Sequence, residues 1–170
     1  NASFTWKETV CLANLTINIE SGSLVGIVGP VGAGKSSLLS AILGEMILVR
    51  GDSKVFGSFS YAAQASWIFA DTIRSNIILN EPFEEDRYGL VVRACCLDVD
   101  LLGFGETGDL TVVGEKGGNL SGGQKARIAL ARALYADTDI YLLDDPLAAV
   151  DQEVARRIYD RCIGPNGFLR

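Results

Sequence analysis

The chain has 170 residues, of which 48% are hydrophobic and 21% are charged, so the composition predicts one globular domain and argues against a disordered chain. The net charge of −6 argues against a nucleic-acid-binding surface. There is no histidine, and the four cysteines form no C-x-x-C pair, which argues against a zinc site. We expect reduced thiols, as in a cytosolic domain.

Membrane and targeting signals are missing from these residues. The most apolar window, "LLSAILGEMILV", is too short to cross a bilayer and contains Glu45, and no signal peptide opens the sequence. The chain begins on a strand-like segment and ends on the turn-rich "GPNGFLR", from which we expect it to be part of a longer protein.

The first third of the chain predicts strands around one helix. "LTINIE" (residues 15–20) alternates apolar and polar side chains, which is typical of a half-buried, antiparallel strand. "LVGIVG" (residues 24–29) is a continuous apolar run, typical of a central strand buried on both faces. Residues 35–46 have helical spacing, and residues 54–61 predict short strands joined at Gly57.

The rest of the chain predicts mainly helices. In order, the pattern indicates a helical stretch over 71–102 broken at Pro82, a loop over 105–119, a helix over 121–135, a buried strand over 139–145 and a last helix over 151–162. Apolar strands that alternate with helices predict an α/β layered fold.

A phosphate-binding loop is predicted between the apolar run and the first helix. "GPVGAGKS" fits the pattern G-x-x-x-x-G-K-[ST]. Its glycines allow successive backbone N–H groups to point at phosphate oxygens, and the helix N-terminus adds partial positive charge. The alternative is an ordinary glycine-rich turn. The residues concerned are Gly29, Pro30, Val31, Gly32, Ala33, Gly34, Lys35 and Ser36, of which Lys35 is expected at the β- and γ-phosphates and Ser36 at Mg²⁺.

Two adjacent carboxylates end the second apolar strand, in "YLLDDP". Phosphate-loop enzymes hold Mg²⁺ with an aspartate at the end of a second buried strand, so Asp144 is the predicted metal ligand. The alternative for Asp144 is a solvated strand end.

"LSGGQ", together with "GPVGAGKS" before it and "LLDD" after it, resembles the nucleotide-binding domain of an ABC transporter. "NASFTW", "YAAQASWIFADTIRSNI" and "DIYLLDDPLAAVD" make it similar to the first such domain of the multidrug-resistance-associated (C) subfamily. The resemblance implies a phosphate-loop NTPase core of mixed or parallel sheet, with an N-terminal antiparallel part and an inserted helical subdomain. That core is expected over 1–70 and 137–170, and the helical subdomain over about 71–136.

The resemblance also implies roles for residues of the ATP site. Trp6 would stack on adenine, although it could be a core tryptophan, and Ser37 would join the phosphate loop. Gln64 would contact Mg²⁺ or its water, or be a surface amide. The segment Trp67, Ile68 and Phe69 would line a groove for a coupling helix of the membrane domains, although aromatic residues are core as often.

The signature pentapeptide implies a partner domain. Leu120, Ser121, Gly122, Gly123 and Gln124 would close over ATP held by a second nucleotide-binding domain in a head-to-tail dimer. Asp151 would cross that dimer interface, which is compatible with its being a helix N-cap. The cofactors implied are ATP and Mg²⁺, the other partners are transmembrane domains of the same polypeptide, and the location is the cytoplasmic face of a membrane.

Three departures from the family pattern bear on activity. Asp145 stands where most members have a catalytic glutamate, and its shorter side chain predicts slow hydrolysis. Ala63 and Val112 replace a proline and an acid that are frequent in the family. The switch histidine and the strand before it would lie beyond residue 170, so the sheet is expected to be incomplete.

The leading hypothesis is an ATP-hydrolysing domain that powers an exporter of organic anions or conjugates. The alternative is a regulatory ATP-binding module that gates a channel or receptor and hydrolyses little ATP. A soluble DNA-repair ATPase would need long coiled-coil insertions, which the sequence does not have.

Overall fold

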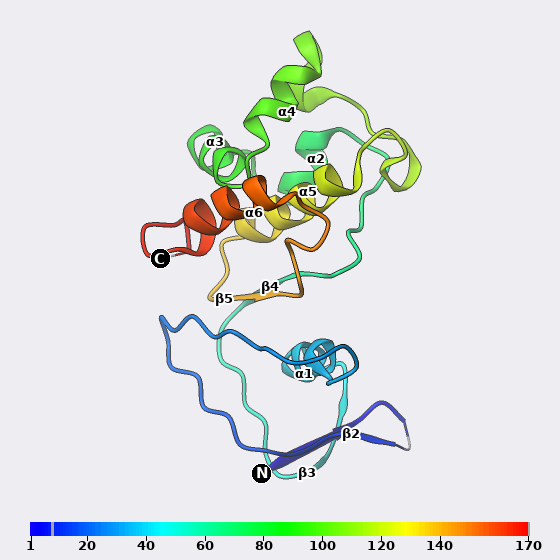
Figure 1. Ribbon diagram of the computed structural model, residues 1–170, viewed down its shortest axis with the longest axis vertical. Helices are drawn as coiled ribbons and strands as arrows, with labels where there is room; N and C mark the ends of the chain where they lie inside the picture. The colour runs from blue at the N-terminus through cyan, green and yellow to red at the C-terminus, as the bar shows by residue number, and fades with distance from the viewer. Residues whose placement is uncertain (8, 170) are drawn as a thin grey trace. The chain divides into compact units, whose positions relative to one another are not determined.

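The computed structural model describes residues 1–7 and 9–169. Its contacts divide the chain into two compact units, Asn1–Phe56 (unit 1) and Gly57–Arg170 (unit 2), both visible in Figure 1. Unit 1 contains β1 (Ala2–Thr5), β2 (Val10–Leu15), α1 (Lys35–Ile42) and β3 (Ile47–Arg50). Unit 2 contains β4 (Phe59–Ala62), α2 (Ile73–Ile78), α3 (Glu85–Ala94), α4 (Asp98–Gly103), the 3₁₀ helices η1 (Gly105–Leu110) and η2 (Glu115–Gly117), α5 (Gly122–Tyr135), β5 (Ile140–Leu143), α6 (Gln152–Ile158) and the π-helical turn η3 (Tyr159–Ile163).

Unit 1 is built on an antiparallel sheet in the order β2-β1-β3. The strand β1 lies between the other two, and its side chains are buried. Phe4 from β1 and Leu12 from β2 form a small core with Ala41 of α1 and with Met46, which directly precedes β3. This core fixes α1, and therefore the loop that leads into α1, against the sheet.

The predicted strands at residues 15–20 and 24–29 are wrong. Strand β2 ends at Leu15, and residues 16–30 belong to no strand. Leu24 is 71% exposed and Val28 is 96% exposed. A central strand needs a hydrogen-bonding neighbour on each side and cover on both faces, and unit 1 supplies neither to this segment. The apolar run therefore remains open, whereas β3, which was not predicted, pairs with β1.

Unit 2 combines a parallel strand pair with helices. The strands β4 and β5 pair in parallel with Phe59 opposite Ile140 and Ala62 opposite Leu143. Next to them, α5 is the longest helix, and α2 and α3 pack against it (Figure 1). The core of the unit lies around α5 and includes Ile73, Ile77, Val91, Leu97, Val113, Ile128, Leu130, Leu134, Ile158 and Cys162.

Most of the predicted helices are confirmed. The helical stretch over 71–102 is divided into α2, α3 and α4, and its first break comes slightly earlier than predicted. Helix α2 ends at Ile78, and the next residue, Leu79, has φ of 52°, which cannot continue a helix. Leu79 lies three residues before Pro82. The structure is thus a mixed α/β fold with one antiparallel and one parallel sheet, as predicted.

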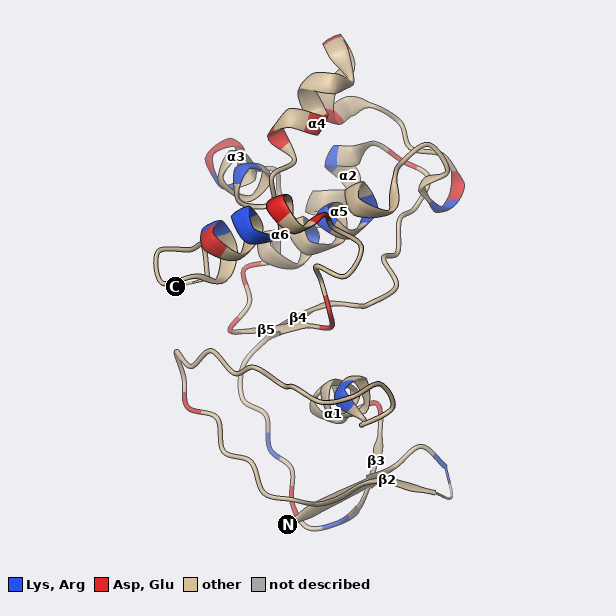
Figure 2. Cartoon of the chain, in the orientation of Figure 1, with Lys and Arg blue, Asp and Glu red and all other residues tan. Residues whose placement is uncertain are grey.

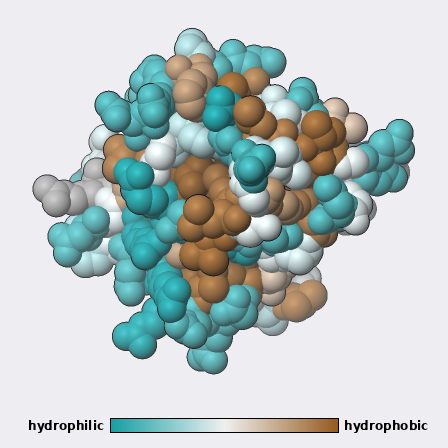
Figure 3. Space-filling view, turned by 90° about the horizontal axis from the view of Figure 1, so that it is seen from above, coloured by the Kyte–Doolittle hydropathy of each residue, from teal (hydrophilic) through white to brown (hydrophobic). Residues whose placement is uncertain are grey.

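The surface of unit 2 is mixed in charge and partly apolar. The helices α3 and α6 each carry both acidic and basic residues, so neither presents a basic stripe of the kind that binds nucleic acid (Figure 2). Apolar side chains lie open on one face (Figure 3), and the exposed apolar residues of unit 2 include Val99, Leu102, Leu110 and Val112. Within the described residues, no helix is both long and apolar enough to cross a membrane.

The cysteines of unit 2 are buried. Cys95 and Cys162 are fully buried, and all four cysteines of the chain are free thiols. Burial raises the pKa of the Cys95 thiol, which keeps it in the unreactive neutral form. These side chains act as small apolar groups in the core.

The segment between β4 and α2 is held by one buried amide. Asn76 is fully buried, and its Nδ2 donates to the carbonyl oxygens of Phe69 and Thr72, both at 3.0 Å. Its Oδ1 accepts from the Phe69 N–H at 3.1 Å and from Arg132 Nη2 at 3.1 Å. The groups that contact Asn76 are partly buried, and its amide is a hydrogen-bonding partner of each of them.

We expect Asn76→Ala to lower the free energy of unfolding of unit 2 by about 3 kcal/mol, because it removes four hydrogen bonds to partly buried groups. Urea denaturation followed by Trp67 fluorescence in a Trp6→Phe background measures this loss. Asn80→Ala is the matched control, because Asn80 is exposed just after α2, and its effect should stay within about 0.5 kcal/mol. Equal effects of the two substitutions would contradict the conclusion that Asn76 holds the segment between β4 and α2.

Candidate functional site

The predicted phosphate loop ends at the first turn of α1. Gly34 is the N-cap of this helix and has φ of 89°, and Gly32 has φ of 83°. Both values lie in the left-handed region that glycine adopts without strain. A Cβ atom on Gly34 would also stand 3.2 Å from Leu12 Cδ2. The two glycines are therefore required by the backbone path itself, as the motif predicts.

The side chain of Lys35 folds back over this loop. Its Nζ donates to the carbonyl oxygens of Gly29, at 2.8 Å, and Pro30, at 3.0 Å. The Ala33 N–H donates to the same Pro30 oxygen at 3.2 Å. A flexible ammonium that has only carbonyl partners can exchange them for the stronger acceptors of a phosphate. The loop thus presents a cation and helix-terminal amides on the same short segment.

Trp6 lies beside the first turn of α1. Its side chain is 45% exposed, so the alternative that Trp6 is a core residue is wrong. The indole Nε1 donates to Ser37 Oγ at 3.5 Å, which is a long and weak hydrogen bond. Ser36, the predicted Mg²⁺ ligand of this helix, is exposed. Within unit 1 the structure therefore brings together an open aromatic ring, two serine hydroxyls and the phosphate loop.

Asp144 stands at the end of β5 and is buried, with 8% of its surface exposed. Its N–H donates to the Ala62 carbonyl oxygen at 2.9 Å, which continues the parallel pairing of β4 and β5. Its Oδ2 accepts from the Tyr61 hydroxyl at 3.3 Å. Because the carboxylate is buried, the alternative of a solvated strand end is wrong for Asp144.

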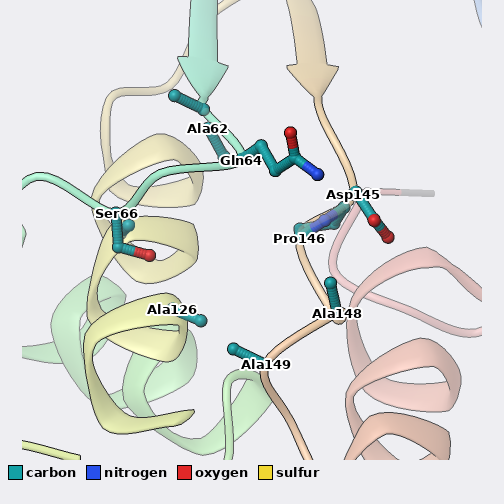
Figure 4. Close-up of a pocket in the computed structure, with 10 residues that line it drawn as sticks. Ala62, Gln64, Ser66, Ala126, Asp145, Pro146, Ala148 and Ala149 are labelled. Atoms are coloured by element: carbon teal, nitrogen blue, oxygen red, sulfur yellow. The ribbon is translucent and has the colours of Figure 1, made fainter. Parts of the chain in front are cut away.

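Asp145 and Gln64 line one small pocket between the ends of β4 and β5 (Figure 4). Figure 4 shows the Gln64 side chain reaching toward the segment of Asp145 and Pro146 after β5. The Asp145 carboxylate points away from Gln64. The pocket holds about 30 Å³ of space, enough for one or two water molecules. Its remaining walls are small residues from the two strand ends and from α5: Ala62, Ala63, Ser66, Ala126, Ala129, Pro146, Ala148 and Ala149.

The backbone of Asp145 is in the left-handed region, with φ of 50°. Aspartate and asparagine tolerate this conformation better than other residues with a Cβ atom. Pro146, which also lines the pocket, follows directly. A fixed, sharp bend at this point directs the Asp145 side chain away from the line of β5.

The signature pentapeptide forms the start of α5. Ser121 is the N-cap, with its Oγ accepting from the Gln124 N–H at 3.2 Å, and Gln124 Oε1 accepts from the Ser121 N–H at 2.9 Å. This reciprocal pair is a capping box. Leu120 is buried in the core of unit 2. Leu120 and Gln124 therefore stabilise the local fold. The other three residues are accessible to solvent: Ser121 and Gly122 are exposed, and Gly123 is partly buried.

Two loops of unit 2 meet at Gly123. A Cβ atom at Gly123 would stand 3.2 Å from the Ala149 carbonyl oxygen, whereas one at Gly122 would meet no atom within 4 Å. Asp151, at the end of the same loop as Ala149, caps α6 by accepting from the Val154 N–H at 3.0 Å. The N-cap alternative for Asp151 is confirmed, and the residue remains exposed.

The predicted coupling groove is corrected at one position. Ile68 is 4% exposed and belongs to the core, so it does not line an open groove. Trp67 is 60% exposed, its ring centroid lies 5.2 Å from that of Phe69, and the Arg132 guanidinium lies 5.0 Å from the Trp67 centroid. The open tryptophan is thus supported by the ring of the partly buried Phe69 and by a cation.

Sequence reasoning missed several residues that support these groups. Tyr61 contacts Asp144, Asn76 and Arg132 hold the segment after Gln64, and Asp100 and Arg127 hold the start of α5. Each contact joins residues far apart in the chain, and no spacing rule connects them. Among the described residues, no group of three or more His, Cys, Asp or Glu side chains is placed to hold a metal ion by itself.

Comparison with known proteins agrees with the motifs. Residues 12–148 match the protein family described as "ABC transporter". The chain is 53% identical over 157 residues to ATP-binding cassette sub-family C member 4 of Homo sapiens. The aligned residues make up 92% of this chain and 12% of that protein. It is 50% identical to sub-family C member 2 of Homo sapiens over 99% of this chain and 11% of that protein.

A third relative is the metal resistance protein YCF1 of Saccharomyces cerevisiae, which is 46% identical over 99% of this chain and 11% of its own length. The chain thus spans 11 to 12% of the length of the curated relatives that it matches. The phosphate loop and the strand-end carboxylates lie within the matched residues 12–148, together with "LSGGQ". The chain belongs to the ABC transporter family.

Proposed function

We propose that this chain binds Mg-ATP through the phosphate loop at residues 29–36. The observation that carries the proposal is the loop geometry: left-handed glycines at 32 and 34, the N-terminus of α1, and the Lys35 ammonium on loop carbonyl oxygens. These are the groups that bind the β- and γ-phosphates in phosphate-loop proteins. The open ring of Trp6 beside Ser37 supplies a surface on which adenine stacks.

Mg²⁺ would be held by oxygen ligands. In unit 1, Ser36 would be a ligand or a water-mediated contact of the ion. In unit 2, Asp144 and Gln64 would each have such a role. Asp144 fits this role because it is a buried carboxylate whose side chain accepts a long hydrogen bond from Tyr61. A buried carboxylate is stabilised by a divalent cation placed against it.

Hydrolysis would use the small pocket between Gln64 and Asp145. Both residues line it and its space suits a water molecule. In this role Asp145 orients the attacking water and Gln64 contacts the metal or that water. The aspartate is one methylene shorter than the glutamate of most family members, so turnover at this domain's own site is slow.

The whole protein is, in this proposal, an ATP-driven exporter, and this chain is its first nucleotide-binding domain on the cytoplasmic face of a membrane. Support comes from the family match and from relatives whose printed names place them in sub-family C. The transported substrates are organic anions or conjugates. No observation favours the alternative of a regulatory module that gates a channel.

The partners are a second nucleotide-binding domain and transmembrane domains. The open amides of Gly122 and Gly123 at the N-terminus of α5 would close over ATP on the partner domain, with Asp151 in the same interface. Trp67 and Phe69 would meet a coupling helix. Residues 71–136 would form the helical subdomain.

The first test is Lys35→Ala in the full-length protein. The substitution removes a charge-assisted contact of about 1.5–3 kcal/mol with the phosphates, so affinity for a fluorescent ATP analogue should fall about 10- to 150-fold. Lys54→Ala is the control, because Lys54 is an exposed lysine of the same unit outside the loop, and it should leave the affinity unchanged. An unaltered dissociation constant for Lys35→Ala would rule out this site.

The second test is Asp145→Glu, measured as single-site ATP turnover in the full-length protein. The longer side chain reaches the water, and correcting a displacement of about 1 Å can raise the rate by up to about 100-fold. The gain is smaller if glutamate tolerates the left-handed backbone less well than aspartate. Asp145→Asn keeps the length and the backbone tolerance but removes the charge, so it should slow turnover further. Equal rates for the aspartate and glutamate forms would show that side-chain length is not the cause of slow hydrolysis.

A further inference from the structure

Asp100 on α4 accepts hydrogen bonds from two side chains of α5. Its Oδ1 accepts from Gln124 Nε2 at 3.0 Å and from Arg127 Nη2 at 3.1 Å, and its Oδ2 is paired with Arg127 Nη1. The Asp100 and Arg127 side chains are 16% and 13% exposed. This largely buried carboxylate therefore links α4 to the first two turns of α5, and it belongs to an element outside the signature motif.

The contact with Gln124 decides which way its amide faces. Gln124 has one acceptor, Oε1, and one donor group, Nε2. The capping box needs Oε1 at the Ser121 N–H, where it accepts at 2.9 Å. An ionised carboxylate accepts and cannot donate, so Asp100 binds only the Nε2 end. Asp100 thus selects the orientation in which Gln124 completes the cap.

Arg127 adds a second constraint on the same turn. Its Nη1 donates to the Cys96 carbonyl oxygen at 2.6 Å, and its Nε donates to the Gly123 carbonyl oxygen at 3.3 Å. The guanidinium neutralises Asp100 and also holds the backbone at Gly123. Asp100 and Arg127 together therefore fix the first turn of α5 to the end of α3 and the start of α4.

We propose that Asp100 is a positioning residue for the signature loop. By setting the Gln124 amide and anchoring Arg127, it preorganises the amides of Ser121, Gly122 and Gly123 for a phosphate group held by the partner domain. That this phosphate belongs to ATP on the partner domain follows from the proposed function, on which this proposal rests. The orientation of the cap itself does not depend on it and can be measured separately.

Asp100→Asn in the full-length protein is the principal test. Asparagine has a single oxygen acceptor, so Arg127 faces its NH2 group in either orientation of the amide, and Gln124 faces it in one of them. Hydrogen–deuterium exchange of the peptide covering 121–125 should become about fivefold faster, as expected when an N-cap is lost. ATP turnover at the partner domain's site should fall, with nucleotide affinity at this domain's own loop unchanged.

Asp109→Asn is the matched control. Asp109 has the same 16% exposure and pairs with Arg74 through two hydrogen bonds, at 2.7 and 3.1 Å, but it does not contact α5 in either of them. If Asp100 had only a structural role, both substitutions would lower thermal stability. They would also change hydrogen exchange at 121–125, and turnover at the partner domain's site, to the same extent. Our proposal requires the exchange and turnover changes in Asp100→Asn alone.

A charge swap gives a rescue test. Gln124→Glu alone sets two carboxylates against each other and should also speed exchange at 121–125. In the double variant Asp100→Asn/Gln124→Glu, the asparagine Nδ2 donates to the carboxylate now at position 124, and the asparagine Oδ1 accepts from Arg127. That carboxylate also accepts from the Ser121 N–H, so slow exchange should return. A double variant that exchanges as fast as either single variant would overturn the proposal.

Failure of the proposed function gives a different result. If Lys35→Ala leaves ATP affinity unchanged while Asp100→Asn still speeds exchange at 121–125, the cap assignment holds and the ATP site is wrong. If Lys35→Ala abolishes binding but Asp100→Asn and Asp109→Asn give equal exchange and equal turnover, Asp100 is not a positioning residue.

Discussion

The architecture of unit 2 depends on the hydrogen bonds of one partly buried guanidinium. Arg132 on α5 donates from Nε to the Asn76 carbonyl oxygen at 2.6 Å and from Nη1 to the Trp67 carbonyl oxygen at 2.8 Å, in addition to its contact with the Asn76 side chain. Burial lowers the pKa of Arg132 to about 10, which leaves it charged near neutral pH. A buried charge must be fully hydrogen-bonded, so the segment after Gln64 and helix α2 must both keep their places around it.

Helix α5 carries this constraint to several parts of the unit. Its N-terminus is held by the capping box and by Asp100, and Arg132 lies in its last turn. Its last carbonyl groups accept from Arg87 of α3, with Nε to the Tyr135 oxygen at 3.0 Å and Nη2 to the Leu134 oxygen at 3.1 Å. Cations at the C-terminus of a helix interact favourably with its dipole. One helix thus orders the signature turn, the pocket wall and the segment before α2.

Local motifs predicted the parts of the molecule that depend on neighbours in sequence. The phosphate loop was found because glycines at 32 and 34 are needed by the backbone, and α5 because its cap and its apolar face are local patterns. The strand predicted at 24–29 did not form, since a strand is completed only by hydrogen-bonding partners, which can be distant in the chain. The capping role of Asp151 followed from its position before a helix.

Sequence patterns could not identify the supporting residues Asn76 and Asp100. Asn76 looks like any polar residue on a short helix, and only the fold shows that it is fully buried between the Phe69 backbone and Arg132. Asp100 looks like one acid among several near the start of α4. Their importance comes from pairing across 56 and 24 positions of the chain, respectively, and that pairing is set by tertiary packing.

The absence of a side chain at Gly123 has a mechanical consequence. A Cβ atom at Gly123 would stand only 3.2 Å from the Ala149 carbonyl oxygen, so the loop that runs from Asp145 to Asp151 lies close against the backbone at the start of α5. Close-packed backbone cannot be compressed, and a shift of either loop toward the other must displace both. A ligand that moved one of them would therefore change the free energy of binding at the other, and by thermodynamic linkage that influence would be equal in both directions.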